Sequence, residues 1–175
     1  SRLEGFAFLP ITCFSQALST FVGQNLGAGK HDRVKKGVGF GIICSCLMAE
    51  LVGVISWVFA PQLISIFNQN PEVVSYGAGH MRTICLFYCL LAFSHCIAGI
   101  LRGAGKAVVP MITMLACWCL IRVTYITVAL PLANQLQTIS WAYPITWGCS
   151  SVVFLIYFLK ADWIHGFDRA EVLRR

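Results

Sequence analysis

Five apolar segments, each close to the length of a membrane-crossing helix, dominate this sequence. A helix needs about 20 residues to cross a bilayer. The segments lack the sustained alternation of apolar and polar residues that is typical of strands, and open sheet edges cannot lie in lipid. The sequence therefore predicts an all-α, polytopic transmembrane helix bundle. The predicted spans cover residues 3–23, 37–60, 81–101, 108–131 and 139–159.

The composition excludes a water-soluble domain. Charged residues make up 11% of the 175 residues and hydrophobic residues 58%, with a mean hydropathy of +0.75, whereas an average soluble domain is about 25% charged. The net charge of +6 comes from connections between the spans, without the aromatic–basic interleaving of a nucleic-acid-binding face. We therefore expect the lipid bilayer as a partner and no nucleic acid. All nine cysteines lie inside apolar segments, which predicts reduced, packed thiols and no metal site.

Basic residues fall on one side of the predicted spans. The connections 24–36 and 102–107 and the tail 160–175 carry ten Lys and Arg residues, whereas the connections 61–80 and 132–138 carry none. Because connections rich in Lys and Arg stay in the cytoplasm, we expect a multi-pass protein of the plasma (inner) membrane with a cytoplasmic C-terminus and an outside N-terminus. The chain begins with Ser and shows no leader, so we expect further helices upstream.

Two stretches outside the spans carry local signals. Asn70-Pro71-Glu72 predicts the start of a helix, because Pro and an acidic residue favour the first turn. Trp141 and Trp163 lie near span ends, where aromatic residues anchor helices at the lipid interface. Residues 161–175 are polar, and we expect a cytoplasmic tail.

A glycine-rich tetrapeptide occurs twice, each time where a span reaches the basic side. Gly27-Ala28-Gly29-Lys30 recurs as Gly103-Ala104-Gly105-Lys106. Glycine there predicts that the helix ends in a left-handed turn, with the lysine near the anionic leaflet. A phosphate-binding loop is excluded, because Gln24 and Leu101 stand where that pattern requires its first glycine.

Around these loops the sequence resembles the multidrug and toxic compound extrusion (MATE) transporters. The residues that carry the resemblance are Phe21–Lys30 with Arg33, Lys36 and Gly37, then Leu101–Lys106 with Pro110 and Met111, then Trp118, Arg122 and Tyr125, and finally Trp141–Trp147. Members have twelve helices in two six-helix bundles and export organic cations in exchange for sodium or protons. The resemblance implies that this chain is the C-terminal bundle, from part of helix eight to helix twelve.

The same resemblance sets the expected function and partners. It implies a xenobiotic antiporter that carries small organic cations, uses Na⁺ or H⁺ as the coupling ion, needs no cofactor and requires the missing N-terminal bundle of the same chain. The family-motif positions in the two loops are Gly23, Gln24, Gly27, Gly29, Arg102, Gly103, Gly105 and Pro110. We expect these loops to hold the cytoplasmic ends of the helices rather than to contact the substrate.

Glu50 and Arg122 are the main candidates for coupling and transport. Glu50 lies about ten residues from the outer end of its span, or roughly 15 Å at helical rise, where desolvation favours a neutral carboxyl group. That property suits a proton-coupled carboxylate. A carboxyl that only packs against a neighbouring helix is the alternative. Arg122 lies at a similar depth, so a buried Glu50–Arg122 ion pair is a further possibility. Arg122 also matches a family-motif position, which implies a structural or gating role rather than contact with the substrate.

His95 and Glu4 are the secondary candidates. The sodium-coupled branch of the family resembles proteins with an acidic residue in the span that corresponds to 81–101, but this span offers His95, Tyr88 and Ser94 instead. Histidine ordinarily titrates at about pH 6.5, although a packing role is the alternative. Glu4, near the start of the first span, could face a central cavity or the outer interface.

Three other functions compete with antiport. A membrane-embedded enzyme needs a nucleophile and a base that converge, yet the predicted spans hold one histidine and no Asp, so we expect no enzyme. A lipid-linked precursor flippase of the same superfamily would need several cationic residues in its cavity, and Arg2, Arg82 and Arg122 are those present. A non-transporting membrane subunit is the third alternative.

Overall fold

The computed structural model describes residues 2–132 and 136–164, with the side chains in these ranges except those of residues 2–4, 6, 7, 130, 132 and 136. Every regular element within the described ranges is helical, which confirms the predicted all-α fold. The elements are α1 (Arg2–Gly27), α2 (His31–Val58), α3 (Ala60–Ser65), α4 (Pro71–Cys85), α5 (Tyr88–Gly103), α6 (Val108–Met114), η1 (Leu115–Ile121), α7 (Arg122–Leu132) and α8 (Leu136–Lys160).

Three helices are long and apolar enough to cross a membrane: His31–Val58, Val108–Ala129 and Gln137–Lys160. A fourth span results if the bent pair α4 and α5 is counted as one crossing. In the described part of the chain α1 is not in this group, although it has 26 residues. The chain is therefore an integral membrane protein, and the span predicted at residues 3–23 stays a prediction.

The α4–α5 pair differs from the single span predicted at 81–101. Helix α4 begins ten residues earlier, at Pro71, where the side chain of Asn70 accepts a hydrogen bond from the Glu72 backbone N–H at 3.0 Å. This cap confirms the helix start predicted at Asn70-Pro71-Glu72. The pair then bends by 54° at its break. Helix α2 crosses there with Gly53, where an added Cβ would collide with the Cys85 carbonyl, so a small residue permits the close approach.

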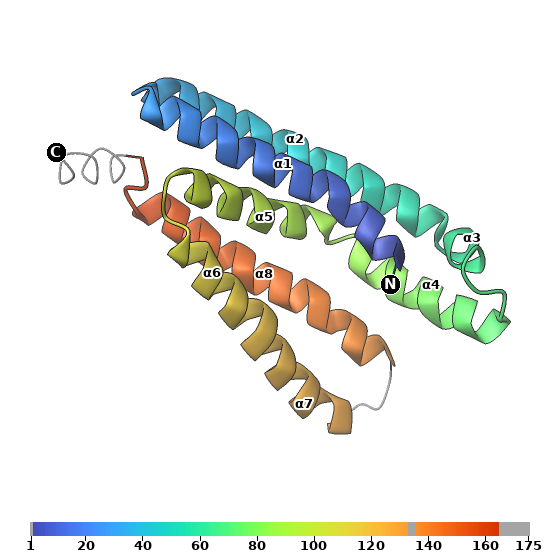
Figure 1. The fold of residues 1–175 in the computed structure, drawn as a ribbon. Coiled ribbons are helices and arrows are strands. Elements are labelled where there is room, and N and C mark those ends of the chain that lie inside the picture. The colour runs from blue at the N-terminus through green and yellow to red at the C-terminus, as the bar shows by residue number, and fades with distance from the viewer. Residues whose placement is uncertain (1, 133–135, 165–175) are drawn as a thin grey trace.

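Helix α5 forms the centre of the bundle. The α1–α2 hairpin packs on one side of it, and α8, backed by the continuous helix of α6, η1 and α7, lies on the other side (Figure 1). Ile97, Ala98, Ile100 and Leu101 are fully buried in α5. The α1–α5 crossing is tight because an added Cβ on Gly99 or Gly103 would collide with a backbone carbonyl of α1, as small residues allow in membrane helix pairs.

The two glycine-rich loops form the same helix cap. Gly29 has φ of 66° and Gly105 has φ of 75°, and the following lysine N–H of each loop bonds to the carbonyl five residues back, at 2.8 Å in both. This arrangement is the left-handed helix end that the sequence predicted. The helix ends between α1 and α2 and between α5 and α6 therefore need a glycine at the position with positive φ.

Both glycine-rich loops and the end of α8 lie at one end of the bundle (Figure 1). One buried cluster joins them, with Leu26, Val34, Ala104 and Trp163 among its members. Trp163 is 5% exposed and stacks on Phe158 with ring centroids 4.9 Å apart. The expectation that Trp163 anchors the chain at the lipid interface is therefore wrong, because its ring is packed inside the bundle.

Candidate functional site

Arg122 is the best candidate for a functional charge within a span. It is the first residue of α7 and follows directly on η1, a π-helical segment; such segments are frequent at functional sites. Its guanidinium lies over the rings of Tyr143, at 4.4 Å from the centroid, and Trp118, at 5.8 Å. Its Nη2 donates a hydrogen bond to Thr146 Oγ1 at 3.0 Å. The side chain is thus held by two aromatic faces and one neutral acceptor.

The sequence explains how these partners converge. Trp118 and Arg122 stand four positions apart on one helix, and Tyr143 and Thr146 stand three positions apart on α8, so each pair shares a helix face. The Thr146 hydroxyl donates to the Ala142 or Tyr143 carbonyl, each at 2.9 Å. Because this bond uses the only hydroxyl hydrogen, the oxygen is left to accept from Arg122.

The rings extend into a continuous row that we call the cation–aromatic ladder, defined as Phe8, His95, Trp118, Arg122 and Tyr143. His95 packs edge-on against Trp118, with centroids 5.5 Å apart, and against Phe8, at 5.8 Å. The ladder therefore draws residues from α1, α5, η1, α7 and α8 into one site. His95 and Arg122, both predicted from the sequence, belong to it, whereas Trp118 and Tyr143 entered the sequence argument only as family-motif residues.

Two ladder side chains carry buried polar atoms that have no hydrogen-bond partner among the described residues: Arg122 Nε and His95 Nε2. Trp147 Nε1, beside the ladder, is a third, and its ring lies 5.8 Å from that of Tyr143. Buried polar groups are normally paired. Their concentration at one place marks the ladder as a site whose hydrogen bonds are incomplete within this part of the chain.

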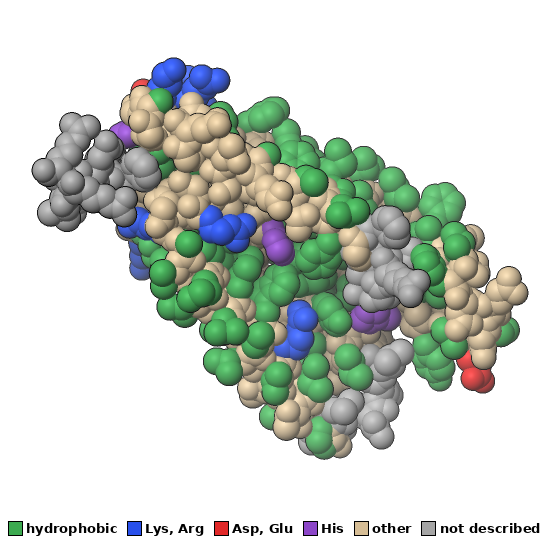
Figure 2. Space-filling view, viewed as in Figure 1, with side chains coloured by type: hydrophobic (Ala, Val, Ile, Leu, Met, Phe, Trp, Pro, Cys, Tyr) green, Lys and Arg blue, Asp and Glu red, His purple; other side chains and the backbone are tan. Residues whose placement is uncertain are grey.

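Positive charge gathers on the face that holds the ladder. Figure 2 shows Lys or Arg and His side chains between α1 and α7, and the acidic side chains that it colours lie toward the two ends of the molecule in that view. Arg102 Nη2 donates to Ser15 Oγ at 2.9 Å, and Ser15 Oγ donates to the His95 carbonyl at 2.6 Å. Arg102, predicted as a loop-motif residue, thus ties α5 to α1 beside the ladder.

Glu50 lies on a different side of α5. Its carboxyl group sits beside the thiols of Cys46 and Cys89, in the contact between α2 and α5, and its Oε2 is buried without a hydrogen-bond partner in the described structure. The possible Glu50–Arg122 ion pair is therefore wrong. The two residues share a depth, but α5 and α8 separate α2 from α7 (Figure 1), and Arg122 bonds to Thr146 instead.

The other predicted residues contribute to the frame or lie outside the description. Gly23 faces the Gly103 carbonyl, 3.3 Å from an added Cβ, and Pro110 is buried in α6. Gln24 and Gly27 are exposed in the last turn of α1. The side chain of Glu4 lies outside the described residues. Within the described residues, no group of three or more His, Cys, Asp or Glu residues could hold a metal ion.

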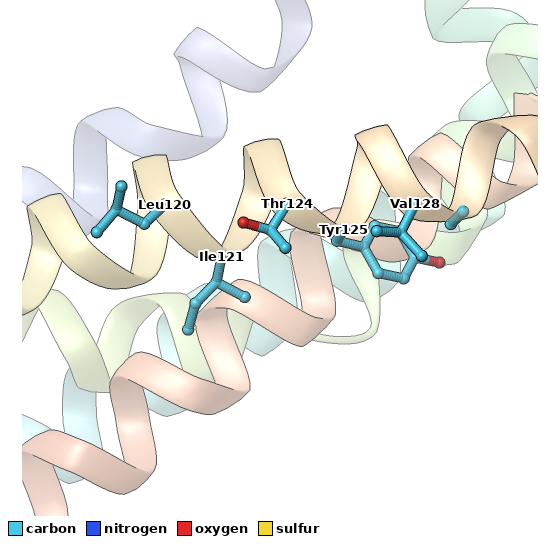
Figure 3. Close-up of a pocket in the computed structure, with 6 residues that line it drawn as sticks. Leu120, Ile121, Thr124, Tyr125 and Val128 are labelled. Atoms are coloured by element: carbon cyan, nitrogen blue, oxygen red, sulfur yellow. The ribbon is translucent and has the colours of Figure 1, made fainter.

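An apolar pocket of about 530 Å³ lies along the same helix as Arg122. The residues that line it are Leu120, Ile121, Thr124, Tyr125, Val128 and Ala129 (Figure 3). Arg122 and the other ladder residues are not among them, so a different part of the helix surface forms its wall.

The sequence matches known proteins over most of its length. The sequence model of the MatE family matches residues 1–128. The chain is 33% identical over 118 residues to a probable multidrug resistance protein NorM of Thermotoga maritima, which covers 67% of this chain and 25% of that protein. It is 32% identical over 174 residues to multidrug and toxin extrusion protein 1 of Danio rerio, which covers 93% of this chain and 28% of that protein.

A solved structure shares the fold. It is the inward-facing conformation of a multidrug resistance MATE family transporter of the MOP superfamily, with a TM-score of 0.76 at 17% identity over 89% of this chain and 37% of the other. This chain spans about a quarter of the length of the two curated relatives.

Proposed function

Because this chain belongs to the MatE family, we propose that it forms the C-terminal bundle of a secondary transporter that exports small organic molecules by alternating access. Such transporters bind cargo near the middle of the membrane, between two bundles of helices. Cargo and coupling ion then favour different arrangements of the bundles. The names of the relatives support multidrug export, and the share of their length that this chain covers leaves room for a second bundle.

One observation supports the location of the cargo site. Arg122 stands near the middle of a membrane-crossing helix, on a half-buried face of the bundle rather than in its core. An ionisable residue at that depth is costly unless it faces protein or a water-filled cavity. We therefore assign the face that carries the ladder to the cavity between the two bundles.

Glu50 is our candidate for coupling to Na⁺ or H⁺. Its carboxyl group lies between α2 and α5 without a cationic partner in the described structure. A carboxyl in that setting can be neutralised by a proton or by a sodium ion, and either event would change the packing of α2 on α5. The proposal predicts that Glu50→Gln removes the response to the driving gradient.

The orientation in the plasma membrane is also a proposal. The glycine-rich loops and the end of α8 carry the basic residues Lys30, Arg33, Lys35, Lys36, Lys106 and Lys160 at one end of the bundle. We place this end in the cytoplasm, because segments rich in Lys and Arg are retained there.

The contacts of Arg122 bear on the charge of the cargo. Family resemblance led us to expect organic cations, and the faces of Trp118 and Tyr143 would attract them. Both faces, however, are already directed at the guanidinium of Arg122. A cationic cargo at this point would meet a like charge.

Reconstitution of the complete protein that contains this chain tests the proposal. We expect proteoliposomes to accumulate a fluorescent organic solute when a Na⁺ or H⁺ gradient is imposed, and to stop when the gradient is collapsed by an ionophore. Cationic, zwitterionic and carboxylate fluorophores should be compared, so that the test does not depend on cargo charge. If the uptake of all three fluorophores does not respond to any imposed gradient, the antiporter proposal is wrong.

A further inference from the structure

We propose that the cation–aromatic ladder binds the carboxylate or phosphate group of a flat aromatic solute, with Arg122 as the anion-binding residue and with Trp118 and Tyr143 holding its guanidinium in place. This inference rests on the proposed function only in treating the ladder as part of the cargo cavity. It assigns an acidic class of cargo to a site at which the family resemblance predicts cations.

The first argument is the missing counter-charge. An arginine stays charged under all ordinary conditions, and a buried arginine without a carboxylate partner is costly. The only hydrogen-bond partner of Arg122 within the described residues is the neutral hydroxyl of Thr146. The ladder therefore offers a positive charge for which this part of the chain supplies no negative one.

The second argument is geometry. The guanidinium of Arg122 lies over the rings of Tyr143 and Trp118, and Thr146 accepts a hydrogen bond from Nη2. The N–H groups of arginine form a planar fork that fits two oxygens of one carboxylate or phosphate. A guanidinium that is already held in place loses less rotamer freedom when the anion binds.

The third argument is the surroundings. The described carboxylates are those of Asp32, Glu50, Glu72 and Asp162, and none of them is paired with Arg122. Arg102 and His95 lie on the same side of α5 as the ladder and add further N–H donors. The site thus combines a cationic centre with aromatic rings.

A set of probes with one ring system tests the proposal on the complete protein in phosphatidylcholine nanodiscs. Calorimetry should compare 2-naphthoate, 2-naphthyl phosphate, neutral 2-naphthamide and (2-naphthyl)methylammonium. We expect 2-naphthoate or 2-naphthyl phosphate to bind at least about tenfold more tightly than 2-naphthamide, the size expected for a charged hydrogen bond. The relative affinities of the two anions decide between carboxylate and phosphate.

Variants separate charge from ring contact. Arg122→Gln should abolish the preference for the anion over the amide, and Arg122→Lys should restore part of it. Trp118→Leu removes one of the two rings that hold the guanidinium, so it should weaken the two anions more than the amide. Arg82→Gln is the matched control, because Arg82 lies over Trp57 at 5.5 Å, outside the ladder; this variant should bind like the unmodified protein.

Several outcomes would overturn the inference. Equal affinity for 2-naphthoate and 2-naphthamide would mean that another part of the protein neutralises Arg122. Tightest binding of the ammonium probe would return the site to organic cations, and equal losses from Arg82→Gln and Arg122→Gln would show a nonspecific charge effect. If Arg122→Gln does not fold, the ratios of Arg122→Lys and Trp118→Leu decide. Anion binding without gradient-driven uptake would contradict the proposed transport and leave the site intact.

Discussion

Glu50 and Arg122 have different neighbours, although the sequence predicts a similar depth for the two side chains. Glu50 lies where α2 packs on α5, beside two thiols. Arg122 is held on a half-buried face by two rings and a hydroxyl. Each has a buried polar atom without a partner in the described residues. The comparison teaches that an ionisable residue inside a helix contact can change the packing, whereas one on a face can contact a solute.

The largest expected effect comes from Glu50. We expect Glu50→Gln to reduce gradient-driven uptake by the complete protein to the level of empty liposomes, because the amide cannot exchange a proton or neutralise a sodium ion. Probe binding at the ladder should persist, since the two sites do not touch. Gradient-driven uptake at the normal rate would make Glu50 a structural residue and remove this half of the comparison.

Substitution at the α1–α5 crossing should damage both regions together. Gly103→Ala places a methyl group against the Ser19 carbonyl, and overpacking of this kind costs about 1–3 kcal/mol. Thermal unfolding of the complete protein in detergent should show a lower midpoint. Gly39→Ala is the control, because nothing lies within 4 Å of an added Cβ there. Equal midpoints for the two variants would contradict the close packing.

Removal of the Thr146 hydroxyl should affect solute binding at Arg122 and leave coupling at Glu50 unchanged. Thr146→Val deletes the acceptor of a charged hydrogen bond at 3.0 Å, and such bonds contribute about 1.5–3 kcal/mol net. We expect a loss of several-fold in anion affinity and no change in gradient response per bound solute. Thr127→Val is the matched control, since Thr127 donates only to its own helix at Val123. A similar loss in both variants would remove Thr146 from the site.

The smallest effect is expected at the loops, away from both ionisable residues. Gly29→Ala forces a side chain into the left-handed region at φ of 66°, at a cost of about 1–2 kcal/mol. Gly27→Ala, two residues earlier within α1 and with open space around it, is expected to be neutral or stabilising. A thermal midpoint that falls in Gly27→Ala but not in Gly29→Ala would contradict the role of the positive φ.

The sequence was sufficient for features that depend on local chemistry or on distance along a helix. The helical class, the cap at Asn70 and the left-handed glycines follow from hydropathy, capping preference and the absence of a Cβ. The similar depth that the residue rise predicts for Glu50 and Arg122 stays a prediction. Family-motif residues also led to Arg122 before any contact was visible.

Rotation about the helix axis was not readable from the sequence. The Glu50–Arg122 pair was wrong because depth does not say which way a side chain points, and α5 lies between. The break after Cys85 depends on the approach of Gly53 from another helix. The ladder joins five elements, so the spacing of Trp118 and Arg122, or of Tyr143 and Thr146, could have indicated only its separate faces.

The π-helical segment Leu115–Ile121 interrupts one membrane helix. The residues before it and after it therefore follow different rotational registers about the helix axis. An α-helix turns by about 100° per residue. The wider turn of a π segment holds more residues than a turn of α-helix does. Deletion of one residue from this segment would therefore rotate Arg122 and all of α7 relative to Val108–Met114. The direction of the charge is thus set by chain length within seven residues, so deletion of one residue other than Trp118 there would turn Arg122 away from Tyr143.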